Sequence, residues 1–270
     1  MTSGESRGHI DSEVPHPARR YNYWLGGKDN FAVDRASGDE IERRFPNTRV
    51  AVRANRDVLG RMVSYLAGEA GIRQFLDIGT GLPTADNTHE VAQRIAPESR
   101  VVYVDNDPLV MTHARALLTS SAQGRTAYIE ADLREPQKIL ADVQLRSVLD
   151  VSRPVAVMLI AVVHFVHGAG SAKPLVDALL EPLAPGSFVA LTHATTDLMT
   201  PENRQNYLTL LESGRLDVWP RPQEEIAALF DGMDLVEPGI VLGTRWRNDA
   251  GEDALADGDT GFWAALAKKR

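Results

Sequence analysis

The strongest constraint on the fold is the alternation of short apolar segments with helix-like segments between residues 73 and 213. Each of five apolar segments of strand length is followed by a helix-like segment. The predicted strands are 73–79, 100–105, 126–132, 154–163 and 187–193. The predicted helices are 85–96, 108–119, 135–149, 172–184 and 201–213. Because crossovers between parallel strands are right-handed, this order predicts a mostly parallel, doubly wound α/β sheet with helices on both faces.

Both ends of the chain depart from this alternation. A predicted helix at 222–232 is followed by two further strands, at 235–242 and 261–268, with no helix between them. Two such strands predict an antiparallel hairpin at the sheet edge, which makes the expected sheet seven-stranded. Ahead of the first strand, helices are predicted at 31–45 and 48–68, and we expect them to cap the sheet edge or a ligand.

These segments divide the chain into three parts. Residues 1–19 are expected to form a flexible tail, residues 20–70 an N-terminal helical cap or lid, and residues 71–270 the doubly wound domain. The longest apolar run, at 155–166, is interrupted by His164 and is shorter than the about 20 residues that a membrane-spanning helix needs. We therefore interpret this run as a buried parallel strand.

Composition narrows the function classes. The 270-residue chain has 37 acidic and 29 basic residues, and its net charge of −8 disfavours a broad nucleic-acid-binding surface. It has no cysteine, which excludes disulfides, thiolate nucleophiles and metal sites with cysteine ligands, and no metal site is predicted. Residues 1–17 lack the apolar core of a signal peptide, so a cytoplasmic location is expected.

Three consecutive predicted strands end in an acidic residue. The first continues into a glycine-containing turn, Asp77-Ile78-Gly79-Thr80-Gly81, and the next two end at Asp105 and Asp132. Glycine lets the backbone turn sharply and lets a ligand approach it closely. Because the carboxyl ends of parallel strands share one edge of the sheet, the three acids indicate a nucleotide cofactor lying across that edge.

This pattern resembles the class I S-adenosylmethionine-dependent methyltransferases, in which five parallel strands are followed by a terminal hairpin. The turn at 77–81 is similar to the first motif of that superfamily, Asp105 stands where its ribose-binding acid stands, and residues 131–133 are similar to its adenine-binding segment. More narrowly, the chain resembles a bacterial family of S-adenosylmethionine-dependent methyltransferases of unknown function. The resemblance rests on residues 21–34, 75–89 and 102–108 and extends over nearly everything after the tail.

The resemblance implies S-adenosylmethionine as cofactor and a set of residues that bind it. Asp77 is expected near the ammonium of the methionine part, Asp105 at the ribose hydroxyls, and Asp132 with the Leu133 amide at the adenine. Asp77 and Asp132 could instead cap the helices that follow them, and Asn106 could lie against the adenine or be a turn residue. The other members of the predicted cofactor-binding set are Gly79, Thr80, Gly81, Ala161, Tyr21 and Asn30.

Residues 21–35 form a second unusual segment, which combines aromatic side chains with a Gly26-Gly27 turn and the polar residues Lys28, Asp29 and Asn30. Such a turn could belong to a lid that closes over the cofactor and excludes water. The alternative is an N-terminal arm that packs on the sheet through its aromatic residues.

His164 is the candidate general base. It follows the fourth predicted strand, at an end that faces the ligand crevice in doubly wound sheets, and its reference pKa is about 6.5. A buried structural histidine is the alternative. His193, at the end of the fifth strand, is a weaker candidate.

The leading hypothesis for function is methyl transfer to a small-molecule acceptor, and the sequence leaves the acceptor and the oligomeric state open. One alternative is a non-catalytic sensor or regulator that binds S-adenosylmethionine. Another is an NAD-dependent oxidoreductase, although the loop lacks the third glycine of the dinucleotide motif and the terminal hairpin is foreign to that strand order. A nucleic-acid acceptor is disfavoured by the acidic balance.

Overall fold

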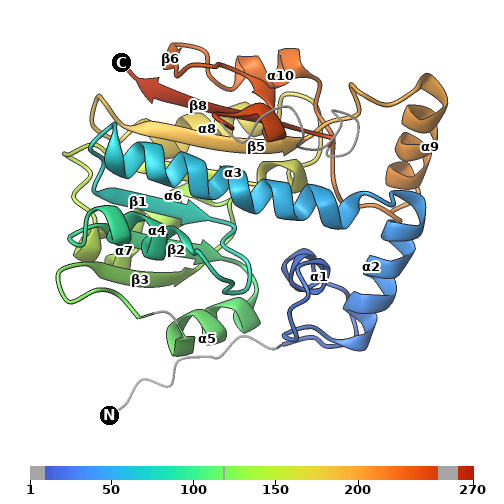
Figure 1. The fold of residues 1–270 in the computed structure, drawn as a ribbon, viewed down its shortest axis with the longest axis horizontal. Coiled ribbons are helices and arrows are strands. Elements are labelled where there is room, and N and C mark those ends of the chain that lie inside the picture. Colours follow the sequence, from blue (N-terminus) through green and yellow to red (C-terminus); the bar gives the residue numbers. More distant parts are fainter. Residues whose placement is uncertain (1–9, 118, 249–260) are drawn as a thin grey trace.

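A computed structural model describes residues 10–117, 119–248 and 261–270 of the chain. The strands in these ranges are β1 Gln74–Ile78, β2 Arg100–Asp105, β3 Arg125–Glu130, β4 Ala156–Ile160, β5 Phe188–Ala194, β6 Met233–Leu235, β7 Val241–Leu242 and β8 Phe262–Lys269. They form one sheet with the order β3-β2-β1-β4-β5-β8-β6, in which β7 also pairs with β8 (Figure 1). Strands β1 to β5 run parallel, and β8 runs antiparallel to β5, β6 and β7.

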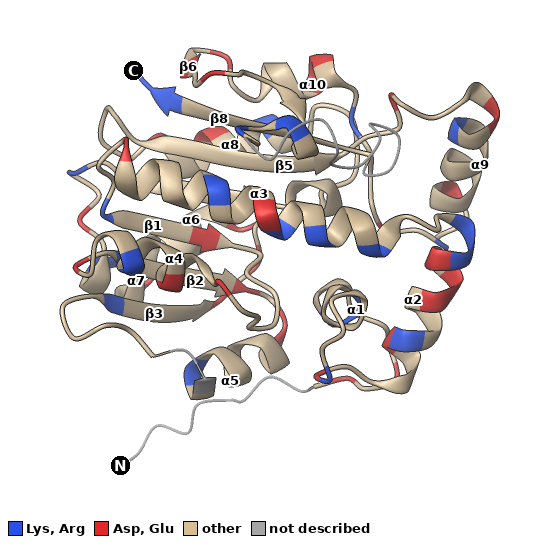
Figure 2. Cartoon of the chain, in the orientation of Figure 1, with Lys and Arg blue, Asp and Glu red and all other residues tan. Residues whose placement is uncertain are grey.

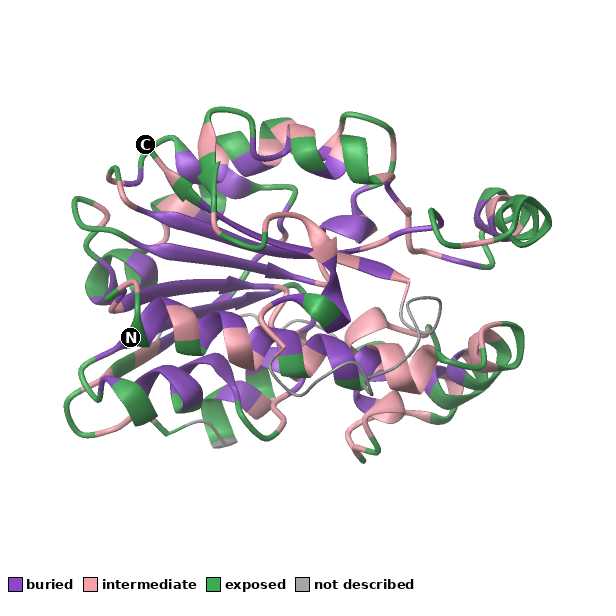
Figure 3. Ribbon diagram, turned by 45° about the horizontal axis from the view of Figure 1, so that its top comes forward, coloured by how far each residue is buried: buried purple, intermediate pink, exposed green. Residues whose placement is uncertain are grey.

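Helices cover both faces of the buried sheet (Figure 3). They are α1 Pro17–Trp24, α2 Ala32–Arg44, α3 Thr48–Gly68, α4 Thr88–Ile95, α5 Pro108–Leu117, α6 Pro136–Ala141, α7 Val143–Val148, α8 Ala172–Leu180, α9 Pro201–Glu212 and α10 Gln223–Ala228, with short 3-10 helices at Val163–Phe165 and Gly243–Arg245. Leu76 and Ile78 of β1 join a core cluster with residues of α6, α7, α8 and α10, whereas Phe75 joins the opposite cluster with α3 and α4. Because side chains alternate along a strand, β1 contributes to both cores.

The predicted fold class is confirmed: the sheet is mostly parallel, with antiparallel strands at its C-terminal edge. The prediction of a single strand at 235–242 is wrong, because β6 ends at Leu235 and β7 begins at Val241. Pro238 and Gly239 lie between the two strands. Proline has no N–H for a strand ladder, and Gly239 has a φ of +83° that extended strands do not adopt. The described residues therefore contain eight strands instead of the expected seven.

The prediction of one helix at 135–149 also needs correction. The helix breaks at Asp142, whose carboxylate accepts a hydrogen bond from the Gln144 N–H at 2.7 Å and caps a separate helix, α7. Aspartate favours such cap positions because its side chain replaces the missing intrahelical acceptor.

The N-terminal cap begins earlier than expected. Helix α1 starts at Pro17, inside the predicted tail, and proline is well tolerated at a first helical position. Arg19 and Arg20 are both buried. Residues 1–9 of the predicted tail, and residues 249–260 between the two last predicted strands, lie outside the described residues.

Two distant parts of the chain build the cap over the carboxyl ends of the strands. In Figure 1, α1 and α2 lie beyond the ends of β1 and β2, and α9 stands beside α2. Phe45, which follows α2, packs against Tyr207 of α9 with ring centroids 5.5 Å apart. The predicted cap of residues 20–70 therefore lacked one member, because α9 comes from the C-terminal half of the chain.

Charged residues of both signs are mixed along α2, whereas α3 carries four arginines and a single acidic residue, Asp57 (Figure 2). Within the described ranges, no helix combines the length and the apolar character that a membrane crossing requires.

Candidate active site

A cavity of about 1150 Å³ lies between the carboxyl ends of the parallel strands and the cap. This volume exceeds the roughly 300–1,000 Å³ of a typical small-molecule site, so the cavity has room for a cofactor together with a second molecule. All predicted site residues except Asn30 line it: Tyr21, Asp77, Gly79, Thr80, Gly81, Asp105, Asn106, Asp132, Leu133, Ala161 and His164. The parallel strands bring these residues together because their carboxyl ends share one edge.

The turn after β1 needs its two glycines for different reasons. Gly79 has a φ of +74°, and a Cβ there would lie 2.3 Å from the Val162 side chain, so packing excludes any other residue. Gly81 has a φ of +67°, and a Cβ there would meet no atom within 4 Å. The backbone at Gly81 is therefore open to close approach by a ligand.

Asp77 is a buried acid at the end of β1. It faces the α3 and α4 side, where Thr88 at the start of α4 donates its hydroxyl to Asp77 Oδ2 at 2.5 Å. Burial raises the pKa of Asp77 to about 6, and the Thr88 hydrogen bond opposes that rise. An acid with this pKa would be ionised more readily if a cation were bound beside it.

Asp105, at the end of β2, is equally buried and accepts two backbone hydrogen bonds. The Gly81 N–H donates to its Oδ2 at 2.8 Å, and the Asp107 N–H donates to its Oδ1 at 2.9 Å. Burial nevertheless raises the pKa of Asp105. Each carboxylate oxygen has a second lone pair, so Asp105 can still accept two hydroxyl donors from a ligand.

Asp132, just after β3, is held mainly by its neighbour Arg134. The guanidinium donates to Oδ1 at 2.8 Å and to Oδ2 at 2.5 Å, and the Asn106 amide donates to Oδ2 at 2.9 Å. These hydrogen bonds hold the pKa of Asp132 well below its usual range. Asn106 and Asp132 therefore form one polar unit across the ends of β2 and β3.

Ala161, just after β4, has a φ of +53°, which is unusual for a residue with a side chain. Its N–H donates to the Thr192 hydroxyl of β5 at 2.9 Å, and this bond helps to hold the conformation. Non-glycine residues in this region cost about 1–3 kcal/mol and cluster at functional sites. The position next to the cavity agrees with that tendency.

The predicted lid residues separate into two groups. Tyr21 lines the cavity, and its hydroxyl donates to the Val52 carbonyl at 3.1 Å and accepts from the Asn55 amide at 2.9 Å. Asn30 does not line the cavity. Its amide donates instead to Asn22 Oδ1 at 2.9 Å and to the Gly27 carbonyl at 3.0 Å, so the geometry assigns Asn30 to the turn and gives no support for a cofactor contact.

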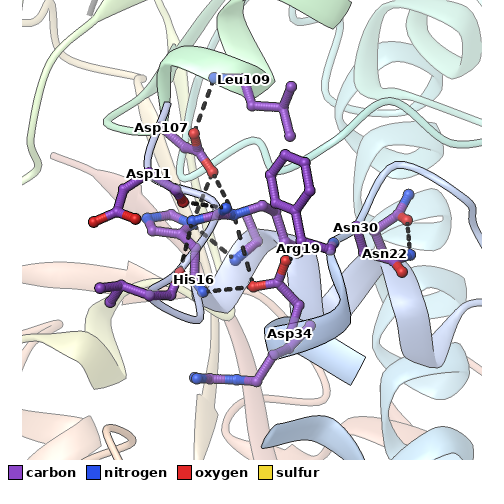
Figure 4. Close-up of polar contacts among 12 residues, drawn as sticks. Asp11, His16, Arg19, Asn22, Asn30, Asp34, Asp107 and Leu109 are labelled. Carbon is purple, nitrogen blue, oxygen red and sulfur yellow. Dashed lines mark hydrogen bonds and ion pairs between the residues drawn. The ribbon is translucent and has the colours of Figure 1, made fainter. Parts of the chain in front are cut away.

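A buried charge cluster, which sequence reasoning missed, ties the cap to the sheet (Figure 4). The Arg19 Nε lies 3.3 Å from Asp107 Oδ2 and 3.7 Å from Asp34 Oδ1, and all three side chains are almost completely buried. Asp107 in turn donates its N–H to Asp105, so the cluster links α1 and α2 directly to the acid at the end of β2. The sequence feature that could have drawn attention to Asp107 is its position two residues after Asp105.

Replacing Arg19 with methionine should loosen the cap. The change leaves the buried Asp34 and Asp107 carboxylates facing one another without their cation, which typically costs about 3–5 kcal/mol. We expect faster proteolysis of residues 10–47 under native conditions, measured by mass spectrometry. Arg43→Met, at an exposed position of α2 where the guanidinium donates to the Asp39 carbonyl of the same helix, is the control and should leave the cleavage rate unchanged. Equal cleavage rates for Arg19→Met and the wild-type protein would contradict the view that this charge cluster ties the cap to the sheet.

A second buried network, also missed by sequence reasoning, lies at the end of β5, where His193 lines the cavity. Arg221 is fully buried and donates to His193 Nε2 at 2.9 Å, to the Val166 carbonyl at 2.8 Å and to Glu225 at 2.8 Å. Burial lowers the pKa of His193 far below its usual range. His193 is therefore a neutral structural residue whose Nε2 accepts a hydrogen bond from the Arg221 guanidinium.

His164 lines the cavity next to this network. Its Nδ1 lies 3.5 Å from the Ala194 N–H, and its ring packs edge-on against Phe165 and His193. The pKa of His164 is lowered to about 4, mainly by burial; Asp217 opposes this shift and Arg221 contributes to it. The imidazole is therefore neutral at pH 7, and it is a weak base.

Residues 3–270 match the model of a protein family described as S-adenosyl methyltransferase. The chain belongs to this family. The predicted family membership and the predicted cofactor, S-adenosylmethionine, are thereby confirmed. The residues present fit this cofactor, because the cavity pairs an open glycine turn with buried carboxylates at the ends of β1 and β2.

Solved structures agree with this membership. A DUF574 family protein from Streptomyces avermitilis is 46% identical, with a TM-score of 0.91 over 97% of this chain and 100% of that chain. A candidate methyltransferase from Thermobifida fusca is 41% identical, with a TM-score of 0.88 over 99% of this chain and 100% of that chain. An O-methyltransferase family protein from Burkholderia thailandensis is 16% identical, with a TM-score of 0.52 over 87% of this chain and 62% of that chain, and it shares the fold alone. No curated protein matches the chain.

Proposed function

We propose that this methyltransferase acts on a small-molecule acceptor. The observation that carries the proposal is the cavity itself, which extends from the glycine turn after β1 to apolar side chains of α2 and α9. A cofactor lying along the ends of β1 to β3 would leave the part under α2 and α9 for the acceptor. The cap would then hold the acceptor beside the cofactor and limit the access of water.

We assign the cofactor to residues at the strand ends. Asp105 offers two acceptor oxygens to the ribose hydroxyls, and the Gly81 backbone allows close approach to the cofactor. Asp77 supplies a buried negative charge for the ammonium of the methionine part. The remaining contacts in the proposal come from Thr80, Asn106, Asp132, Leu133, Ala161 and Tyr21, all of which line the cavity.

S-adenosylmethionine supplies a methyl group that is already activated on a sulfonium, so a general base is required only when the acceptor must lose a proton. The main contribution of the chain would be to align the acceptor with that methyl group. A conjugate acid with a pKa of about 4 makes His164 a poor general base at pH 7. An acceptor that reacts without a strong base, such as an uncharged amine, suits this site best.

Calorimetric titration tests the cofactor assignment directly. We expect micromolar binding of S-adenosylmethionine and of its demethylated product, about −8 kcal/mol, and no binding of NAD. Tight binding of NAD alone would contradict the proposal. Transfer of a labelled methyl group to members of a small-molecule panel would separate an enzyme from a sensor.

The affinity for S-adenosylmethionine should rise with pH through the titration of Asp77. Burial raises its pKa to about 6, so the carboxyl is mostly protonated at pH 5 and mostly ionised at pH 7. Only the ionised form attracts the cofactor ammonium, so affinity should increase about tenfold over this range. Calorimetry at several pH values measures the change. In Asp77→Asn the rise should disappear, and an unchanged pH profile in that variant would contradict the assignment.

A further inference from the structure

The part of the cavity under the cap, here called the distal chamber, is lined largely by apolar and aromatic side chains. They come from α1, the end of α2, the 3-10 helix after β4, and α9 with its flanking loops, and include Trp24, Phe45, Phe165, Met199, Tyr207 and Leu216. The Tyr207 hydroxyl is already used, because it donates to the Val218 carbonyl at 2.8 Å. The chamber therefore presents mainly aromatic ring faces and aliphatic groups to a bound molecule, and fewer free polar groups.

The chamber is also electrostatically balanced. The two arginines that line it are both paired with an acid, Arg20 with Asp217 and Arg44 with Glu40. An anionic molecule would lose its hydration here without gaining a free cation. The site favours a neutral molecule.

His164 in the chamber wall has one ring nitrogen without a protein partner among the described residues; Arg20 Nε and Asn55 Oδ1 are further unpartnered polar atoms of cavity-lining residues. His164 Nδ1 accepts a long hydrogen bond, with a nitrogen–nitrogen distance of 3.5 Å, from the N–H of the half-buried Ala194. A neutral imidazole has one lone pair on nitrogen, so Nε2 must carry the hydrogen. In the described part of the chain Nε2 has no hydrogen-bond partner, and the residue lines the cavity. Nε2 is thus a hydrogen-bond donor, and in this tautomer it cannot take a proton.

We propose that the distal chamber binds a neutral aromatic acceptor molecule and that His164 orients it by donating the Nε2–H to an oxygen of that molecule. The inference rests on the proposed function, because it names the acceptor class of the same site. His164 is then a positioning residue, and the general-base role considered from the sequence is replaced.

Three matched probes test the acceptor class in protein saturated with the demethylated cofactor. The probes are 2-acetylnaphthalene, which has a neutral carbonyl, 2-isopropenylnaphthalene, which has the same shape without an oxygen, and 2-naphthoate, which is anionic. Titration should show that 2-acetylnaphthalene binds about 3- to 10-fold more tightly than the isopropenyl compound, since one neutral hydrogen bond distinguishes them. The anion should bind most weakly.

Variants at position 164 test whether His164 causes the difference in affinity between the two neutral probes. His164→Phe keeps a ring without an N–H, so both neutral probes should bind with equal affinity. His164→Gln restores an amide donor and should restore part of the difference. Binding of the demethylated cofactor by each variant shows that the site is intact.

The proposal fails if the two neutral probes bind equally to the wild-type protein, or if none of the three binds while the demethylated cofactor does. It also fails if 2-naphthoate binds most tightly, which would point to Arg20, whose Nε is buried without a hydrogen-bond partner. Failure of the cofactor itself to bind would instead overturn the proposed function.

Nitrogen-15 NMR of histidine-labelled protein gives a readout independent of any probe. The His164 signals, assigned with His164→Gln, should show a neutral ring with hydrogen on Nε2 from pH 6 to 8. An Nδ1–H tautomer, or a charged ring at pH 6, would overturn the donor role.

Discussion

Replacing Asp105 with alanine should weaken the binding of S-adenosylmethionine by about 10- to 150-fold. The carboxylate would accept the ribose hydroxyls, and hydrogen bonds to a charged group contribute about 1.5–3 kcal/mol. The effect should be large because Asp105 is buried and is held in place by the N–H groups of Gly81 and Asp107. Calorimetric titration of the variant measures the loss.

The neighbouring strand provides a matched control. Glu130 ends β3 directly beside Asp105 in the sheet register, but its side chain is exposed and does not line the cavity. Glu130→Ala removes the same charge from the same edge and should leave the affinity within about twofold of the wild-type value. Circular dichroism should show that both variants are folded. Equal affinities for Asp105→Ala and Glu130→Ala would refute the ribose assignment.

Replacing Arg221 with methionine should lower the free energy of unfolding by about 3–5 kcal/mol. The side chain is fully buried, so water cannot replace its hydrogen bonds. Its loss would leave the His193 Nε2 and the Val166 carbonyl without the donor that each has in the native structure, and the Glu225 carboxylate without its cation. Urea denaturation monitored by circular dichroism measures the change.

A substitution at an exposed arginine tests whether burial causes the loss of stability expected for Arg221→Met. Arg94 of α4 pairs with Asp86 at 2.5 Å, and both side chains are about two-thirds exposed. Arg94→Met should change the free energy of unfolding by less than about 1 kcal/mol, because solvent screens such pairs. A loss below 1 kcal/mol for Arg221→Met as well would show that the buried network contributes little to stability.

The strand-end residues could be predicted because their roles are local. Asp77, Gly79 and Gly81 lie within five consecutive residues, and a strand followed by a helix leaves few conformations for the turn between them. Parallel strand order then brings Asp105 and Asp132 to the same edge without any knowledge of packing. For these residues the pattern alone led to positions that line one cavity.

The two buried networks could not be predicted in this way. Arg19 looks like part of a polar tail, and Arg221 lies in a short loop between two prolines, Pro220 and Pro222. An arginine is normally exposed, so only its partners reveal that it is buried. Those partners, Asp107 for one and His193 for the other, come from distant parts of the chain.

The sequence by itself determined the parallel sheet, the edge at which the predicted site residues gather and the family to which the chain belongs. These properties depend on the order of apolar segments and on short motifs, which act over a few residues. Only the tertiary structure decided that α9 joins α2 over the cavity and that His164 is buried against His193. Both depend on packing and desolvation between residues far apart in the chain, and no local pattern records which of them meet.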